Sequence, residues 1–175
     1  GYWSYGIGTT SMCVAALIVT LFAVTTQFEA RSWFDPRYAI PLLGMILGNT
    51  MNGVSLCLDR LLSAVHGGRV AIEARLALGA DASTALSSIR REAMRTGMVP
   101  TVNAMSATGL VSLPGMMTGQ ILAGVEPVEA VKYQILVMFL IGGGTALGVF
   151  AAVFFASQRL TDARHRLRLD RLTTK

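Results

Sequence analysis

The run from Val131 to Ser157 decides the fold class, and it reads VKYQILVMFLIGGGTALGVFAAVFFAS. Its only charged side chain is Lys132, next to its start. A helix needs about 20 consecutive, predominantly apolar residues to cross a bilayer. The run therefore predicts a membrane-spanning helix.

Three other runs have the same character and precede this one. Residues 7–28 and 38–58 hold no charged side chain, and residues 99–124 hold none either but are broken at Pro114–Gly115. A buried helix of a soluble protein could imitate one such run, whereas four in a chain of 175 residues favour lipid as the solvent. We therefore expect an all-α, polytopic transmembrane helical fold.

The composition agrees with a lipid environment. Hydrophobic residues make up 53% of the chain and charged residues 14%, whereas a soluble domain carries about 25% charged residues. Small residues spaced by four let helices approach closely in a bilayer. The predicted close contacts are Gly44-x3-Gly48, Gly115-x3-Gly119 and Gly144-x3-Gly148.

The basic residues are concentrated in two segments. Twelve of the 15 Lys and Arg residues lie in 59–97 and 159–175. Because Lys and Arg are retained on the cytoplasmic side of a membrane, loop 59–97 and tail 158–175 are predicted to be cytoplasmic. This describes a multi-pass protein of the inner (plasma) membrane with a cytoplasmic C-terminus. The lipid bilayer is then a partner, and nucleic acid is not, since no nucleic-acid-binding motif accompanies the charge.

Loop 59–97 has the pattern of two amphipathic helices joined by a turn. We expect the helix of run 38–58 to continue beyond the membrane and to stop at Gly79, with the Asp81 carboxylate capping a second helix. The second helix has a one-sided apolar stripe, made of Ala82, Ala85, Leu86, Ile89 and Ala93. Such a pair either rests on lipid headgroups or inserts a coupling helix into a groove of a partner protein.

Part of this loop resembles a known motif. Glu73-Ala74-Arg75-x3-Gly79-x9-Ile89 is similar to the cytoplasmic EAA loop of bacterial ABC importers, where Glu-Ala-Ala-x3-Gly-x9-Ile-x-Leu-Pro is typical. Arg75 replaces the second Ala, and Arg91-Glu92 stand in place of Leu-Pro. Three further segments extend the resemblance, namely PLLGMILGN at 41–49, VSLPGMMTGQ at 111–120 and AVKYQI at 130–135. Together they resemble the FetB family, the permease half of an iron-export ABC transporter, to which plant aluminium-tolerance permeases also belong.

The resemblance implies the permease subunit of an ATP-driven exporter of iron or a related metal, working as a homodimer with a FetA-type ATPase. ATP and Mg would be bound by that partner and no cofactor by this chain, which has no Gly-x4-Gly-Lys-Ser/Thr phosphate loop. The residues expected to couple to the ATPase are Glu73, Arg75, Gly79, Ala80, Asp81 and Ile89. Family members are longer, so we expect residues 1–175 to be a single permease domain that lacks N-terminal spans.

A transport pathway is predicted where polar groups and a helix break lie at membrane depth. Discontinuous helices often mark substrate sites, and polar residues in a membrane either serve function or bridge helices. The candidates are Asn49, Asn52, Asn103, Pro114, Met116, Met117 and Gln120. Thioethers suit Cu(I) better than iron and methionine fills packing gaps, so the metal ligands stay undefined.

Two alternatives stay open. An ABC permease for another cargo, such as a sugar nucleotide or a phosphate compound, would be favoured by basic residues in the pathway, and none lies at membrane depth. A non-transporting scaffold or sensor would be favoured by a large soluble domain, which these residues do not predict. No enzyme motif such as a Gly-x-Ser-x-Gly elbow or His-Glu-x2-His is present, so we expect a transport subunit and no catalytic residues.

Overall fold

The computed structural model describes residues 6, 8–15, 18–19, 36–108 and 114–161. All the regular elements in these ranges are helices, which confirms the all-α class. They are α2 (Pro36–Gly67), α3 (Arg69–Ala77), α4 (Ala82–Ala85), α5 (Ser87–Ala107), α6 (Gly115–Leu122) and α7 (Pro127–Leu160). Residues 8–15 are also helical.

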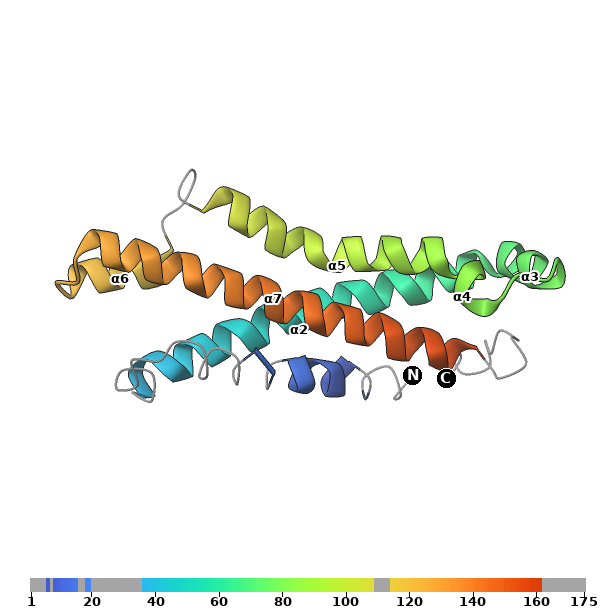
Figure 1. Ribbon diagram of the computed structural model, residues 1–175, viewed down its shortest axis with the longest axis horizontal. Helices are drawn as coiled ribbons and strands as arrows, with labels where there is room; N and C mark the ends of the chain where they lie inside the picture. The colour runs from blue at the N-terminus through green and yellow to red at the C-terminus, as the bar shows by residue number, and fades with distance from the viewer. Residues whose placement is uncertain (1–5, 7, 16–17, 20–35, 109–113, 162–175) are drawn as a thin grey trace.

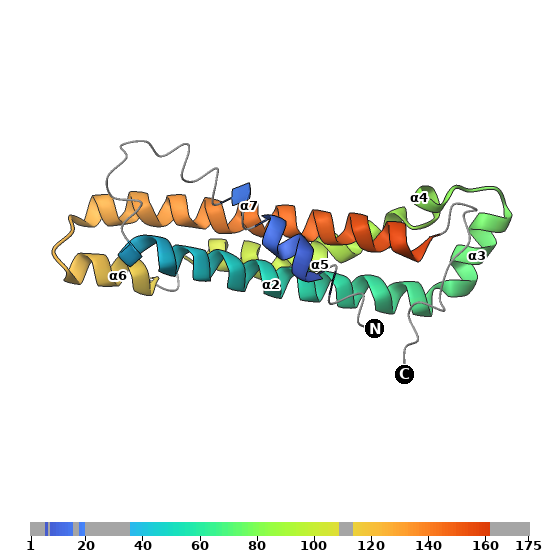
Figure 2. The same ribbon diagram turned by 90° about the horizontal axis from the view of Figure 1, so that it is seen from below.

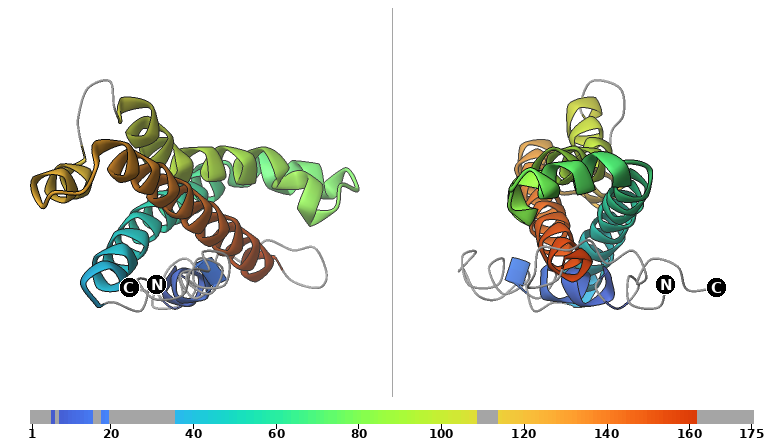
Figure 3. Two further views of the ribbon diagram at one scale, coloured as in Figure 1. Left: turned by 60° about the vertical axis from the view of Figure 1, so that its left-hand side comes forward. Right: turned by 90° about the vertical axis from the view of Figure 1, so that its right-hand side faces the viewer.

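The long helices α2, α5 and α7 form the body of an elongated bundle (Figure 1). Seen obliquely along the bundle, α2 and α7 cross as an X, and α5 packs against both (Figure 3). Helices α3 and α4 lie at one end, next to the C-terminal ends of α2 and α7 (Figure 2). Helix α6 lies at the opposite end, beside the start of α7.

Two helices of the described chain are long and apolar enough to cross a membrane, Ile40–Gly67 in α2 and Pro127–Leu160 in α7. The second contains the whole predicted run 131–157, and the first contains the predicted run 38–58 except for its first two residues. At about 1.5 Å per residue, their 28 and 34 residues extend over roughly 42 and 51 Å. Both are longer than the hydrocarbon core of a bilayer, which is about 30 Å thick, so both can extend beyond it.

The other two predicted runs do not appear as single long helices in the described ranges. Run 7–28 lies mostly outside the described residues. Run 99–124 is divided between α5, which ends at Ala107, and α6, whose N-cap is Pro114. The predicted loop 59–97 takes in the end of α2, all of α3 and α4, and the first half of α5. The four-span topology stays a prediction.

Glycines allow three helices to touch where α2, α5 and α7 cross. A Cβ added to Gly53 would lie 2.7 Å from Cγ2 of Thr145 and 3.0 Å from the carbonyl oxygen of Gly97. A Cβ added to Gly148 would lie 2.5 Å from Cγ2 of Thr50. A side chain does not fit at these distances, so small residues set how closely the backbones approach, as is usual between helices in membranes.

The predicted glycine pairs divide into two groups. Gly144-x3-Gly148 faces α2 as expected, since added Cβ atoms would meet Ile46 and Thr50. Gly44-x3-Gly48 and Gly115-x3-Gly119 have nothing within 4 Å of an added Cβ, so neither pair forms a close contact within the described chain. The prediction of close contacts is therefore confirmed for Gly144-x3-Gly148 and stays a prediction for the other two pairs.

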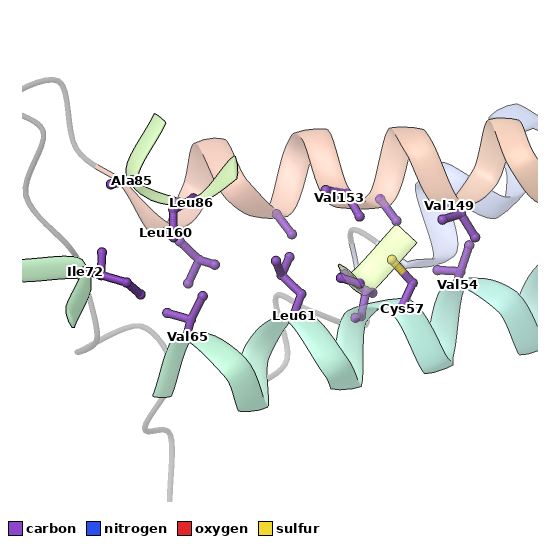
Figure 4. Packing of buried hydrophobic residues seen from close by; sticks show 14 residues of the cluster. Val54, Cys57, Leu61, Val65, Ile72, Ala85, Leu86, Val149, Val153 and Leu160 are labelled. Carbon is purple, nitrogen blue, oxygen red and sulfur yellow. The ribbon is translucent and has the colours of Figure 1, made fainter. Parts of the chain in front are cut away.

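The larger of two buried clusters runs from the crossing to the α3–α4 end. It joins α2, α5 and α7 and takes in Ile72 of α3, Ala85 of α4 and Leu86, as Figure 4 shows. The smaller cluster lies toward the α6 end and contains Val19, Leu42, Ile46, Val137, Leu140 and Ile141. The α3–α4 end is thus continuous with the main core of the bundle.

Candidate functional site

The corner between α2 and α3 is made by Gly68. The helical hydrogen bonds continue through it, because the Gly68 N–H donates to Ala64 O at 2.9 Å and the Ile72 N–H donates to Gly68 O at 3.0 Å. A Cβ on Gly68 would lie 2.9 Å from Ala64 O, so a side chain would push the two helices apart. The expectation of one helix continuing to Gly79 was wrong at this residue, and α3 turns away from the axis of α2 (Figure 2).

Helix α3 stops at Gly79, as predicted. Gly79 has φ +90°, the left-handed conformation that only glycine adopts without strain. The Gly79 N–H donates to Leu76 O and the Ala80 N–H to Arg75 O, both at 3.1 Å. These two bonds form a Schellman motif, which satisfies carbonyls that the helix end leaves without partners.

Helix α4 begins after Asp81, which occupies the predicted N-cap position. Its backbone is extended, with φ −69° and ψ 157°, and its carbonyl accepts the Ala85 N–H at 2.9 Å. The predicted bond from its carboxylate to the first helical N–H groups is not formed. The Asp81 side chain is exposed and accessible at the turn.

Buried side chains and one side-chain bond fix the α3–α4 segment (residues 69–86) to the bundle. Ile72, Ala85 and Leu86 are 2% exposed or less and converge on the last turn of α7 (Figure 4). The Arg75 Nη1 group donates to Ala85 O at 3.4 Å, which links α3 to α4. Next to the segment, Arg60 of α2 forms an ion pair with Glu92 of α5. The segment is therefore anchored to all three long helices.

The outer surface of the segment combines charged and apolar side chains. Glu73 and Arg75 are exposed, and Glu73 accepts a hydrogen bond from Arg69 Nε at 2.8 Å. Val70 and Leu78 are 80% and 88% exposed, and Leu78 directly precedes Gly79. Sequence reasoning did not single out Leu78, because its exposure follows from where the turn ends and not from its type.

The apolar stripe of the second predicted helix is confirmed. Ala82, Ala85, Leu86 and Ala93 are buried, and Ile89 is half-buried against the main cluster. Of the six predicted coupling residues, Ile89 therefore belongs to the packing that holds the segment in place. Ala80 is half-buried, and the other four, Glu73, Arg75, Gly79 and Asp81, lie on the exposed surface.

The structure disperses the predicted pathway residues over three helices. Asn49 is half-buried, and its Nδ2 donates to Met45 O one turn earlier, at 2.8 Å. Asn52 of α2 and Asn103 of α5 are exposed. The other candidates, Pro114, Met116, Met117 and Gln120, are half-buried at or in α6. Met116 packs against the smaller cluster, as a space-filling residue would.

Several buried polar groups were missed. Thr50 and Thr145 are fully buried at the helix crossing, and their hydroxyls have no hydrogen-bond partner in the described structure. Gln134 of α7 is 7% exposed, although it lies inside an apolar run. A hydroxyl or amide in an apolar run does not show which face of the helix packs against other helices. The burial of these three residues could therefore not be predicted from the sequence. In the described ranges, no three His, Cys, Asp or Glu side chains are grouped as a metal site.

This arrangement defines a class of protein. Two long apolar helices cross at glycines, residues 133–158 of α7 carry no charge, and large apolar side chains such as Phe139 and Phe150 point outward, 72% and 59% exposed. Outward apolar faces together with small residues at the helix contacts are typical of bundles in lipid. The fold is that of a helical membrane protein.

The chain belongs to the family described as uncharacterised protein family UPF0014, which matches residues 2–161. It is 39% identical over 142 residues to the probable iron export permease protein FetB of Escherichia coli, covering 81% of the chain and 55% of that protein. It is 52% identical over 120 residues to UPF0014 membrane protein slr1647 of Synechocystis, covering 69% of the chain and 46% of that protein. These matches confirm the resemblance inferred from the sequence.

A plant relative belongs to the same group. Protein ALUMINUM SENSITIVE 3 of Arabidopsis thaliana is 33% identical over 121 residues, covering 69% of the chain and 44% of that protein. The chain thus spans about half the length of these curated relatives. No solved structure matches the chain. The chain is a member of a family of membrane proteins.

Proposed function

We propose that the chain is part of the permease subunit of an ABC exporter, and that the α3–α4 segment receives the force of a separate ATPase. The observation that supports this most directly is the shape of the segment. Its Schellman turn holds Leu78, Arg75 and Asp81 on the outer surface, while its inner side is fixed to the main core. An exposed apolar side chain among charged ones, on a rigid support, suits insertion into a partner's groove.

The proposed mechanism is a movement of long helices about their crossing. The segment is attached to α2 at Gly68, to α5 through Leu86, and to the end of α7 through buried contacts. A push on the segment would therefore move three helix ends together. Since α2 and α7 cross at Gly53, Thr145 and Gly148, displacement at one end would change their separation at the other, which is a way to switch access to a pathway.

The cargo we propose is iron or a related metal, because the relative from Escherichia coli is named a probable iron export permease. The pathway would lie between α2, α5, α6 and α7 and involve the predicted polar residues together with Thr50, Thr145 and Gln134. Intramembrane polar groups are functional candidates by default. A second copy of the permease would complete the pathway, and the ATPase would supply ATP and Mg.

The α3–α4 end is the end we assign to the cytoplasm of the inner membrane. Arg60, Arg69, Arg75 and Arg95 are among the basic residues that gather at this end, and basic residues are retained on the cytoplasmic side. The opposite end, around α6 and the starts of α2 and α7, has two basic residues in the described ranges, Arg37 and Lys132. An ATPase that uses cytoplasmic ATP could then reach only the α3–α4 segment.

The test is co-purification of the tagged protein from its own membranes with variants at the two ends. Leu78→Arg places a charge on the exposed turn and should remove a phosphate-loop ATPase from the purified complex. Leu122→Arg is a matched control, because Leu122 is 83% exposed at the opposite end. If both variants retain the ATPase equally, the turn is not the docking point. If no ATPase accompanies the wild-type protein, the scaffold or sensor alternative replaces this proposal.

A further inference from the structure

A pocket of about 190 Å³ lies where the start of α5 meets the last turns of α7. Its walls combine two apolar helix faces with one guanidinium and several neutral polar groups. The lining residues are Ala82, Ser83, Leu86, Arg90, Phe154, Ser157, Gln158 and Thr161. Among the described residues that line the pocket there is no carboxylate, and the one charge they contribute is that of Arg90.

Arg90 is poorly satisfied by its protein neighbours. Its side chain is half-buried, and its Nη1 group donates to Ser83 Oγ at 3.4 Å, a long bond. A guanidinium has five N–H donors and no acceptor, and within the described residues Arg90 forms no ion pair. The nearest carboxylate along α5, Glu92, is paired with Arg60 instead. The geometry leaves donors of Arg90 available to an anion in the pocket.

Of the other polar groups of the pocket, Ser83 and Gln158 can donate to an anion. The hydroxyls of Ser157 and Thr161 already donate, to Phe154 O at 2.9 Å and to Ser157 O at 3.2 Å, so they offer an anion no proton. Gln158 is exposed and can direct its amide N–H groups inward or outward. Ser83 accepts from Arg90, which leaves the hydroxyl proton of Ser83 to donate to a ligand.

The position of the pocket identifies the source of the anion. Above it on α7, Phe150, Phe154 and Phe155 are 59%, 40% and 51% exposed, and below it the polar residues Gln158 and Arg159 follow. An outward apolar face followed at once by polar residues is expected where a helix passes from hydrocarbon into the headgroup layer. A phosphate at this depth belongs to a lipid, and its acyl chains would have Phe150 and Phe154 to lie against.

We propose that this pocket binds the phosphate of an anionic phospholipid, held by Arg90 with Ser83 and Gln158. Guanidinium groups recognise phosphate oxygens through paired, charge-assisted hydrogen bonds. A lipid in this place contacts α4, α5 and α7 at once and bridges the α3–α4 segment to the end of α7. The proposal stands whether or not the segment meets an ATPase.

A neighbouring basic surface provides a contrast. Arg91 and Arg95 line a wider hollow with Ser87, Ser88 and Glu92, and all five residues belong to α5. That hollow has no wall from another described helix, and it contains a carboxylate. It therefore offers general attraction to an anionic membrane surface and no enclosed site, which makes Arg91 a matched control for Arg90.

The test is native mass spectrometry of the purified membrane protein in mixed micelles that contain phosphatidylglycerol or phosphatidylcholine. The wild-type protein should retain phosphatidylglycerol in preference to phosphatidylcholine. Arg90→Gln should lower the phosphatidylglycerol-bound fraction about tenfold or more, the loss expected when a hydrogen bond between charged groups is removed. Arg91→Gln should lower it about fivefold or less, the factor that one basic residue near an anionic surface contributes. Equal occupancy in the two variants would overturn the proposal.

Two further arms complete the test. Gln158→Glu places a negative charge in the pocket on an exposed residue, so it should also reduce phosphatidylglycerol binding even if Arg90→Gln fails to fold. Unchanged occupancy in Gln158→Glu would overturn the proposal. Inorganic phosphate at millimolar concentration should not displace the lipid; if it does, and if its own binding depends on Arg90, the ligand is free phosphate and the lipid assignment is wrong.

Discussion

The two ends of the bundle use the same backbone device in different surroundings. At one end α3 stops at Gly79, with φ +90°, and at the other α6 stops at Gly124, with φ +89°. At the second stop the Gly124 N–H donates to Ile121 O and the Val125 N–H to Gln120 O, both at 3.0 Å, so both turns are Schellman motifs. An acidic residue follows each turn and begins the next helix, Asp81 before α4 and Glu126 before α7.

The difference lies in what each helix buries and exposes. Helix α3 buries Ile72 and carries three charged side chains, Arg69, Glu73 and Arg75, whereas α6 has no fully buried residue and no charge. The same turn thus presents a charged, anchored surface at one end and an apolar, lightly held surface at the other. The turn determines the shape, and the side chains around it determine which environment or partner each end can meet.

The largest predicted effect is that cysteines placed at the two ends react with a thiol reagent from opposite sides of the membrane. In a background where the exposed Cys13 is replaced by Ser, Leu78→Cys should react with a membrane-impermeant thiol reagent only from the cytoplasmic side. Leu122→Cys should react only from the opposite side, because the basic residues gather at the α3–α4 end. Mass shifts in inside-out and right-side-out vesicles measure this. Labelling of both cysteines from one side would disprove the assignment of the ends.

Removal of one isoleucine side chain should lower the free energy of unfolding several-fold more at the α3–α4 end than at the α6 end. Ile72→Ala removes a side chain that is 2% exposed, so it should lower the free energy of unfolding by about 2–4 kcal/mol. Ile121→Ala makes the same change in α6, where the side chain is half-buried, and should cost about 1 kcal/mol or less. Denaturant titrations in one detergent compare them. Equal losses would show that the α6 end is as firmly packed as the α3–α4 end.

The glycine stop should show a smaller effect that depends on the substituent. Gly79→Val places a β-branched residue at φ +90° and should cost about 1–2 kcal/mol, although nothing lies within 4 Å of an added Cβ. Gly79→Asn should cost less, because Asn tolerates the left-handed region. Thermal unfolding of both variants, with the same pair at Gly124, tests this. If the loss of stability followed the volume of the new side chain, crowding around the turn would be its cause. The positive φ of Gly79 would then not be the cause.

The smallest predicted effect concerns ion pairs. Arg60 and Glu92 join α2 to α5 near the α3–α4 segment and are about half-exposed, whereas Lys132 and Glu129 at the other end lie three residues apart within α7. A double-mutant cycle with Gln should give about 0–1 kcal/mol for the first pair and about 0.2–0.5 kcal/mol for the second. A value above about 2 kcal/mol for either pair would contradict their exposure to solvent.

Local features were predictable from the sequence because they depend on residues close together in the chain. The apolar runs 38–58 and 131–157, the stop at Gly79 and the stripe from Ala82 to Ala93 all follow from spacing and residue type. Gly144-x3-Gly148 was recognised for the same reason. Each of these lies within one helix or one turn, apart from the stripe, which the structure divides at Leu86 between α4 and α5.

Features that depend on which helix faces which were not predictable. The contact of Gly53 with Gly97 joins residues far apart in sequence, and nothing in either helix alone marks these two glycines above Gly44 or Gly48. The break at Gly68 arises because Ile72 turns into the core, and that core is assembled from several helices. The burial of Thr50 and Thr145 likewise follows from the crossing, so it is visible only once α2 and α7 are in place.

The most direct test of the account is cross-linking at the two turns in native membranes, in the Cys13→Ser background. With a short thiol-to-amine cross-linker, Leu78→Cys should give a covalent product with a phosphate-loop ATPase, and its yield should change when ATP is added. Leu122→Cys, treated identically, should give no such product. A product at Leu122, or none at Leu78 while the ATPase remains bound, would show that the α3–α4 segment is not the coupling site.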